Sequence, residues 1–148
     1  MLSIGEFSNI CQVSTKTLRY YAEDVYKRQP HELVYKTLVT IGKSGGYYVF
    51  VIPIEAEIDF KKAARTVKEK SLEMLHLKDL TKVTGYIRGG CTAIGMKKQF
   101  PTVIQESAKK LEQIHISGGR LGMQLKLSPF DLQKAANAEF ADVIRTDD

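Results

Sequence analysis

Hydrophobic positions between residues 34 and 54 fall in two runs that are rich in β-branched and aromatic side chains. The runs cover residues 34–41 and 47–54, and the sequence GKSGG at residues 42–46 separates them. This pattern predicts two strands joined by a hairpin, because glycines supply the backbone conformations that tight connections need. Shorter strands are predicted at residues 72–75, 102–104, 113–117 and 123–127, with a turn at residues 117–120.

Apolar residues recur at helical spacing directly after Asp59. Phe60, Ala63, Ala64 and Val67 stand at positions i, i+3, i+4 and i+7, which predicts a helix with a buried stripe and Asp59 as its N-cap. A basic set occupies the other face: Lys61, Lys62, Arg65, Lys68 and Lys70. Such a face is either a solvated helix surface or a guide for an RNA backbone.

Two further helices are predicted later in the chain. One covers residues 77–83, and the other opens at Pro129 with Asp131 in its first turn, where a proline and an acidic residue are both favourable. The apolar residues at 140–144 are expected to dock on the sheet. Helices and strands are therefore mixed along the chain, which indicates an α+β fold from residue 30 onward.

The first 23 residues have a different pattern. Ser3 and Glu6 form a capping box for one short helix, and a second is predicted from Thr15 through Tyr21 after a break at residues 12–14. The stretch SIGEFSNICQVSTKTLRYYAE resembles the start of the helix-turn-helix of MerR-type transcription regulators. That resemblance implies a recognition helix over residues 14–21, in which Arg19 and Tyr20 contact the DNA backbone.

Residues 24–29, DVYKRQ, fit neither neighbour and are interpreted as a junction. The sequence therefore divides into a helical fragment at residues 1–23, the junction, and a domain at residues 30–148. A hypothesis for the junction is a join between unrelated reading frames, and resequencing across residue 24 tests it.

Charge and cysteine content indicate the kind of partner and the cellular compartment of the protein. Lysine and arginine exceed aspartate and glutamate by 22 − 17 = +5, and the pI is about 9.1, which favours a polyanionic partner. Cys11 and Cys91 lie eighty residues apart, which argues against a zinc site or a disulfide framework and fits a reducing cytoplasm. No run is long enough for a membrane span, and no secretion signal is recognisable, so a cytoplasmic protein is expected.

The segment TGYIRGGCTAIGMKKQFPTVI, residues 84–104, concentrates glycines and positive charge. Four glycines fall within eleven residues, at 85, 89, 90 and 95. Cys91 and Thr92 directly follow the second and third of them, and Lys97 and Lys98 come after the last. A loop that bends, exposes backbone amides and carries cations suits a ligand with a carbonyl or a phosphate. The alternative is a plain glycine-rich turn between strands.

Several separated motifs resemble, in order and spacing, the YbaK/EbsC family of aminoacyl-tRNA deacylases. They are VYKTLV at residues 34–39, IDFKKAAR at 58–65, TGYIRGGCTAIGMKK at 84–98, FPTVI at 100–104, HISGGRLG at 115–122 and EFADVIR at 139–145. The resemblance implies a mixed, β-barrel-like sheet flanked by helices. It also implies ester cleavage of mischarged tRNA, typically Cys-tRNA(Pro), without a metal or organic cofactor. Aminoacyl-tRNA is the expected partner, and prolyl-tRNA synthetase is a second candidate. Membranes and DNA are not expected partners.

The same resemblance assigns roles to residues. Lys36 would orient the ester carbonyl or terminal phosphate, and the N–H groups of Gly89 and Gly90 would face the developing oxyanion. Further substrate-facing positions are Cys91, Thr92, Ser117, Gly118 and Gly119. In cysteine-specific members the substrate's own thiol attacks the ester, so Cys91 need not be a nucleophile, and no histidine is near it in sequence. For Lys36 the alternative is an edge-strand lysine that points to solvent.

Two departures from the family pattern carry expectations. Thr92 and Ala93 stand where Ser-Pro is usual, which predicts a less rigid loop. The helix and strands with which the family domain normally begins are replaced by the regulator-like fragment, which predicts an exposed sheet edge and a more open pocket. Two other functions stay open: a non-catalytic tRNA-binding or synthetase-associated module, and a DNA-binding regulator based on residues 1–23.

Overall fold

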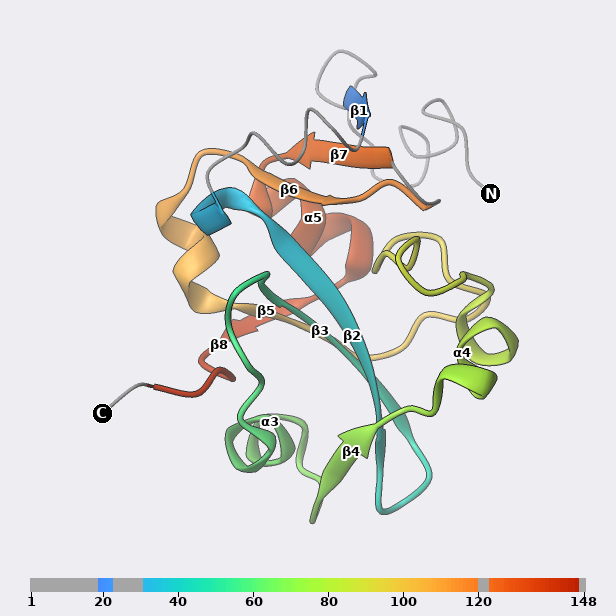
Figure 1. The fold of residues 1–148 in the computed structure, drawn as a ribbon. Helices are drawn as coiled ribbons and strands as arrows, with labels where there is room; N and C mark the ends of the chain where they lie inside the picture. The colour runs from blue at the N-terminus through green and yellow to red at the C-terminus, as the bar shows by residue number, and fades with distance from the viewer. Residues whose placement is uncertain (1–18, 23–30, 120–122, 147–148) are drawn as a thin grey trace.

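Two β-sheets and three α-helices make up the part of the chain that the computed structural model describes, residues 19–22, 31–119 and 123–146 (Figure 1). The larger sheet has the strand order β4-β2-β3-β5-β8 and the smaller one the order β1-β7-β6. The strands are β1 (Arg19–Ala22), β2 (Tyr35–Gly42), β3 (Tyr47–Pro53), β4 (Leu72–Met74), β5 (Thr102–Gln105), β6 (Ile114–Ser117), β7 (Met123–Leu127) and β8 (Glu139–Ala141).

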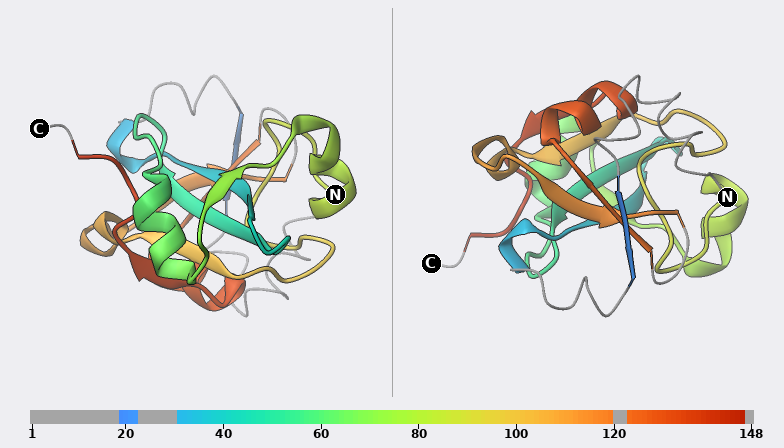
Figure 2. Two further views of the ribbon diagram at one scale, coloured as in Figure 1. Left: turned by 90° about the horizontal axis from the view of Figure 1, so that it is seen from below. Right: turned by 90° about the horizontal axis from the view of Figure 1, so that it is seen from above.

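Helices connect and cover these strands. They are α3 (Phe60–Val67), α4 (Leu77–Thr84) and α5 (Pro129–Ala136), with short 3-10 helices η1 (His31–Leu33) and η2 (Glu106–Lys110). Both views in Figure 2 place η1 and η2 at one end of the molecule and α4 at the other. None of the helices in the described residues is long and apolar enough to cross a membrane.

The larger sheet is mixed in direction. β2 pairs antiparallel with β3 and β4, whereas β5 pairs parallel with both β3 and β8. The predicted hairpin, the later strands and the α+β class are confirmed. The barrel-like prediction is confirmed only as a mixed sheet: in the described residues there are two sheets and no closed barrel.

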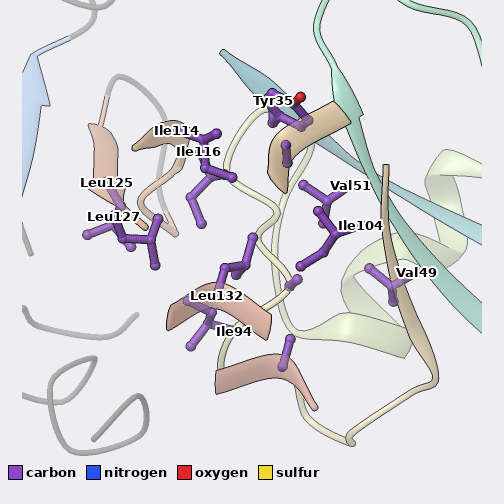
Figure 3. Close-up of a cluster of buried hydrophobic side chains, with 13 residues drawn as sticks. Tyr35, Val49, Val51, Ile94, Ile104, Ile114, Ile116, Leu125, Leu127 and Leu132 are labelled. Carbon is purple, nitrogen blue, oxygen red and sulfur yellow. The ribbon is translucent and has the colours of Figure 1, made fainter. Parts of the chain in front are cut away.

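Opposite faces of the larger sheet pack on different helices. Tyr35, Val49 and Val51 face a core that continues through Ile114, Ile116, Leu125 and Leu127 of the smaller sheet to Leu132 of α5 (Figure 3). Phe50 and Ile52, whose side chains alternate with these, pack instead on Ala63 and Ala64 of α3. We call the first the inner face and the second the outer face.

The N-cap and the buried alanines of α3 follow from its local sequence. The Asp59 carboxylate accepts the N–H groups of Lys61 at 3.0 Å and Lys62 at 3.1 Å, as its predicted role of N-cap requires. Ala63 and Ala64 are buried, but Phe60 remains 37% exposed. The prediction that Phe60 belongs to the buried stripe is therefore wrong, because the first turn of α3 extends past the edge of its core.

The C-terminal segment docks on the sheet as predicted. β8 lies beside β5, and Val143 is fully buried. The Val143 N–H donates to Oε1 of Gln105 at 2.8 Å, and its carbonyl accepts the N–H of Asp59 at 2.8 Å. These bonds tie the end of the chain to both β5 and the start of α3.

The N-terminal prediction is corrected for the residues that the structure describes. Arg19–Ala22 form strand β1 in antiparallel register with β7, with Arg19 opposite Lys126. A recognition helix through Tyr21 that presents Arg19 and Tyr20 to DNA is therefore wrong, because the backbone there forms a sheet ladder. The remaining parts of the predicted helices and most of the junction lie outside the described residues.

Candidate functional site

The candidate site lies where the pairing of β2 and β6 is incomplete, and we call this unpaired stretch the gap. Val34, directly before β2, forms one parallel bridge with His115 of β6, and no further bridge joins these two segments in the described residues. Beyond that bridge, the segment after α4 contacts both strands: the Gly89 carbonyl accepts a hydrogen bond from Ser117 Oγ at 3.5 Å, and Cys91 packs on Val39. This segment, residues 85–100, is the glycine loop, and it spans the open end of the gap.

Strand alternation decides which side chains share a side of this gap. Val34 and His115 form a bridged pair, so Lys36 and Ser117, two residues further along each strand, lie on that same side. Lys36 also stands opposite Ile52, which belongs to the outer face. The outer rim of the gap therefore carries Lys36 from β2, Ser117 from β6 and, in contact with Ser117, Gly89 from the glycine loop.

Lys36 is not a lysine that simply points to solvent. It is half-buried and lines a cavity of about 690 Å³ on the outer face, together with Leu38 and residues at the start of α3. The antiparallel partner of β2 on one edge is β3, whereas β4 reaches only as far as Thr40 on the other edge. Lys36 thus stands on a stretch of β2 that β4 does not pair, beside the cavity on the outer face.

Hydrogen bonds at its base hold the glycine loop in shape. Tyr86 Oη donates to the Ile94 carbonyl at 2.5 Å, and the Lys97 N–H donates to the Thr84 carbonyl at 3.0 Å. The Thr84 hydroxyl donates to the Leu80 carbonyl at 2.8 Å and accepts the Tyr86 N–H at 3.0 Å. The loop is thereby anchored to the end of α4.

Two of the glycines have a clear backbone reason. Gly85 ends α4 with a φ of 87°, and Gly89 adopts a φ of 82° at the rim of the gap, values that favour glycine over other residues. Gly90 differs, because it is buried and its N–H donates to the Ile87 carbonyl at 3.0 Å. The predicted wall of two free amides is therefore wrong for Gly90, whose amide closes a turn.

Cys91 supports the loop from inside. Its side chain packs with Val39 and Tyr86 in a small buried cluster on the inner face. Burial raises the pKa of the Cys91 thiol to about 11, although a hydrogen bond with Thr84 acts in the opposite direction. The thiol is protonated at neutral pH and packs on the inner face with Val39, the face opposite to that of Lys36, which argues against a nucleophilic role. The predicted substrate contact of Cys91 stays a prediction.

The second predicted turn is partly described. The Gly119 N–H donates to Ser117 Oγ at 3.4 Å, and Gly119 has a φ of 94°. Gly118 and Gly119 are both buried next to Ser117. Residues 120–122, which complete this turn, lie outside the described part of the chain.

Sequence reasoning missed two polar side chains at the gap. Thr37 Oγ1 and Gln124 Oε1, like Thr92 Oγ1, are buried and have no hydrogen-bond partner in the part of the chain that the structure describes. Gln124 stands directly opposite Ser117, whereas Thr37 stands opposite Val51 and so points to the inner face, away from Lys36. A buried unpaired polar atom costs about 1–3 kcal/mol, so Gln124 Oε1, on the side of Ser117, is a candidate to bond a ligand at the gap. The sequence signal was a polar residue inside an apolar strand.

The matched family is the aminoacyl-tRNA editing domain, whose model covers residues 15–135. The chain belongs to this family, and membership makes it an aminoacyl-tRNA editing enzyme, a deacylase. A curated relative in Enterococcus faecalis (strain ATCC 700802 / V583) is 50% identical over 110 residues, which are 74% of this chain and 67% of the relative. It is named as a candidate Cys-tRNA(Pro)/Cys-tRNA(Cys) deacylase, EbsC.

Solved structures share the fold at low sequence identity. A candidate trans-editing enzyme for prolyl-tRNA synthetase has a TM-score of 0.82 at 19% identity, with 99% of this chain and 100% of that chain covered. The hypothetical protein APE2540 has a TM-score of 0.84 at 19% identity, with 96% and 99% covered. The family match begins at residue 15, inside the predicted N-terminal fragment. The boundary at residue 30 stays a prediction.

Proposed function

We propose that this chain cleaves the ester of mischarged tRNA of the Cys-tRNA(Pro) type, and that the reacting ester lies at the outer rim of the β2–β6 gap. The observation that carries the proposal is the meeting of Ser117 and Gly89 at 3.5 Å on the side of the sheet that carries Lys36. The name of the Enterococcus relative supports the choice of substrate.

The rim offers what ester cleavage needs. Attack on the carbonyl carbon develops negative charge on the carbonyl oxygen, and a cation held beside it lowers that barrier without reorganisation. Lys36 supplies the cation, and the Ser117 hydroxyl supplies a hydrogen-bond donor whose present partner, the Gly89 carbonyl, is distant enough at 3.5 Å to be exchanged. Cleavage of the ester bond releases the acyl group and leaves the ribose oxygen protonated as a hydroxyl.

Two routes supply the attacking atom. In hydrolysis, water adds to the carbonyl and the products are the free amino acid and tRNA. With a cysteinyl ester, the substrate's thiol attacks its own carbonyl, a cyclic thioester leaves, and the thiol proton passes to the ribose oxygen. Neither route needs a protein nucleophile, which agrees with the burial and raised pKa of Cys91.

Replacement of Lys36 by alanine tests the proposal. Lys36→Ala should lower kcat/KM on Cys-tRNA(Pro) by roughly 100-fold or more, since a transition-state charge contact in a shielded site is worth several kcal/mol. Lys43→Ala is the matched control: Lys43 is exposed beside the hairpin turn at the far end of β2. The midpoint of thermal unfolding should stay the same in both variants.

The outcome separates the competing functions. Full activity of Lys36→Ala would reject the role of Lys36, and a wild-type chain that binds tRNA without turnover would favour the non-catalytic module. The regulator function loses its support because Arg19–Ala22 pair with β7. We further propose a cytoplasmic location and a transient complex with prolyl-tRNA synthetase, the partner named for the structural relative; co-sedimentation with the synthetase and tRNA tests the complex.

A further inference from the structure

A connected pair of hollows leads away from Lys36 along the outer face. The first is the 690 Å³ cavity, which runs from Lys36 to Phe60 and Lys61 at the start of α3. The second, of about 540 Å³, is lined by Phe60 and Lys61 as well, and continues past Arg65 to Lys70. Because they share Phe60 and Lys61, the hollows adjoin at the start of α3, and we call the two together the track, which begins beside Lys36.

The track is positively charged where it has free side chains. Lys61, Arg65 and Lys70 are exposed, and no ion pair engages them among the described residues. Lys61 and Arg65 are four residues apart, so they lie on one face of α3, about 6 Å apart along its axis. The track thus presents a row of cations, none of which is in an ion pair with an acidic side chain of the described residues.

Acidic residues of the track are already engaged. Glu57 pairs with Arg145 at 3.0 Å, and the Asp59 carboxylate caps α3. Glu69 is held toward the hairpin by the hydroxyls of Ser44 and Tyr48, and these hydrogen bonds lower the pKa of its carboxyl. Lys62 is excluded from the row, because it pairs with Asp142 at 3.0 Å.

Apolar surface lies beside the cations. Phe60 is 37% exposed and Met74 is 41% exposed, and both line the first cavity with Leu38. An exposed aromatic ring next to lysine and arginine is the combination on which single-stranded nucleic acids bind, since bases stack on the ring and phosphates meet the cations. A protein partner would more often meet a larger, less charged surface.

We propose that this track binds the 3′ end and acceptor strand of the tRNA, with the terminal base at Phe60 and the preceding phosphates along Lys61, Arg65 and Lys70. The inference rests on the proposed function, because it takes its direction from the ester site at Lys36. It extends that function by naming the surface that holds the nucleic acid.

Binding of uncharged tRNA tests the surface independently of catalysis. In the triple variant Lys61→Gln, Arg65→Gln, Lys70→Gln, the slope of log affinity against log salt should become shallower by about 2 to 3, since each phosphate contact contributes about 0.7–0.9. The matched control is Lys109→Gln, Lys110→Gln, Lys134→Gln, which removes the same charge from η2 and α5. These two elements pack on the inner face, and all three lysines are exposed. Fluorescence anisotropy at several salt concentrations measures both variants.

A second variant tests the stacking position. Phe60→Ala should weaken binding of a short oligonucleotide ending in CCA by roughly 5- to 100-fold, the range for loss of one aromatic stacking contact. The triple variant should affect full-length tRNA more than this oligonucleotide. Circular dichroism and the unfolding midpoint verify that each variant keeps its fold.

The results distinguish failure of this inference from failure of the proposed function. Equal salt slopes for the wild type and the triple variant, or an equal loss in the control, would overturn the inference even if deacylation is normal. If the triple variant binds tRNA with normal affinity but loses activity only when prolyl-tRNA synthetase is present, the track binds a protein. That result would also overturn the inference. Absence of turnover by the wild type, with the predicted binding changes, would reject the enzyme and keep the tRNA surface.

Discussion

Replacement of Tyr86 by phenylalanine isolates the contribution of loop anchoring. The change removes one oxygen atom, whose hydrogen bond to the Ile94 carbonyl measures 2.5 Å and closes a segment of eight residues. Ile94 is fully buried and Tyr86 is 6% exposed, so the carbonyl loses its partner in a region with little access to water. A buried acceptor left unpaired costs about 1–3 kcal/mol.

This magnitude predicts two measurable effects. For a chain of this length, 1 kcal/mol shifts the unfolding midpoint by about 2–4 °C, so Tyr86→Phe should unfold roughly 2–12 °C lower. The glycine loop should also sample positions in which Gly89 leaves Ser117, and a loss of about 1.4 kcal/mol in alignment lowers kcat/KM tenfold. We therefore expect deacylation of Cys-tRNA(Pro) to fall about tenfold at a temperature where the variant is still folded.

Tyr35→Phe is the control for this experiment. The Tyr35 hydroxyl bonds Ser107 Oγ at 2.9 Å, and Tyr35 is 3% exposed, but this pair lies on the inner face away from the glycine loop. The control should lose comparable stability and keep its activity. If Tyr86→Phe loses stability but keeps kcat/KM, or if both variants lose activity equally, anchoring of the loop does not position the site and the reasoning is refuted.

Two further predictions concern titrating groups. Cys91→Ala should keep at least half of the deacylase activity, and Cys91 in the wild type should react slowly with iodoacetamide at pH 8 because its pKa is about 11; rapid alkylation with loss of turnover would contradict this. Burial, and then the charge of Lys126, lowers the pKa of His115 below 6.5, so protons bind the unfolded chain preferentially. The contribution of His115 to the free energy of unfolding should therefore be complete above pH 6.5 and decrease as the pH falls below it. Urea denaturation between pH 5 and 8 measures this effect, and the free energy of unfolding of His115→Gln should depend less on pH.

Local patterns predicted the elements whose causes are local. The hairpin of β2 and β3 follows from β-branched runs around a glycine-rich connection, and α3 follows from Asp59 and the spacing of Ala63 and Ala64. The same reasoning failed for Arg19–Ala22, where a helical pattern yielded to pairing with β7 more than one hundred residues away. Backbone pairing with a distant strand can override local propensity, and no local signal announces it.

The candidate site shows the same division. The sequence by itself determined the residue types: glycines that allow left-handed backbone at residues 85 and 89, a cation in an apolar strand at Lys36, and a basic face on α3. Only the tertiary structure decided that Ser117 meets Gly89, that Cys91 faces inward and that the amide of Gly90 is already bonded. The physical reason is that periodicity records which side of its own element a residue occupies, whereas a site forms where strands distant in sequence approach and then separate.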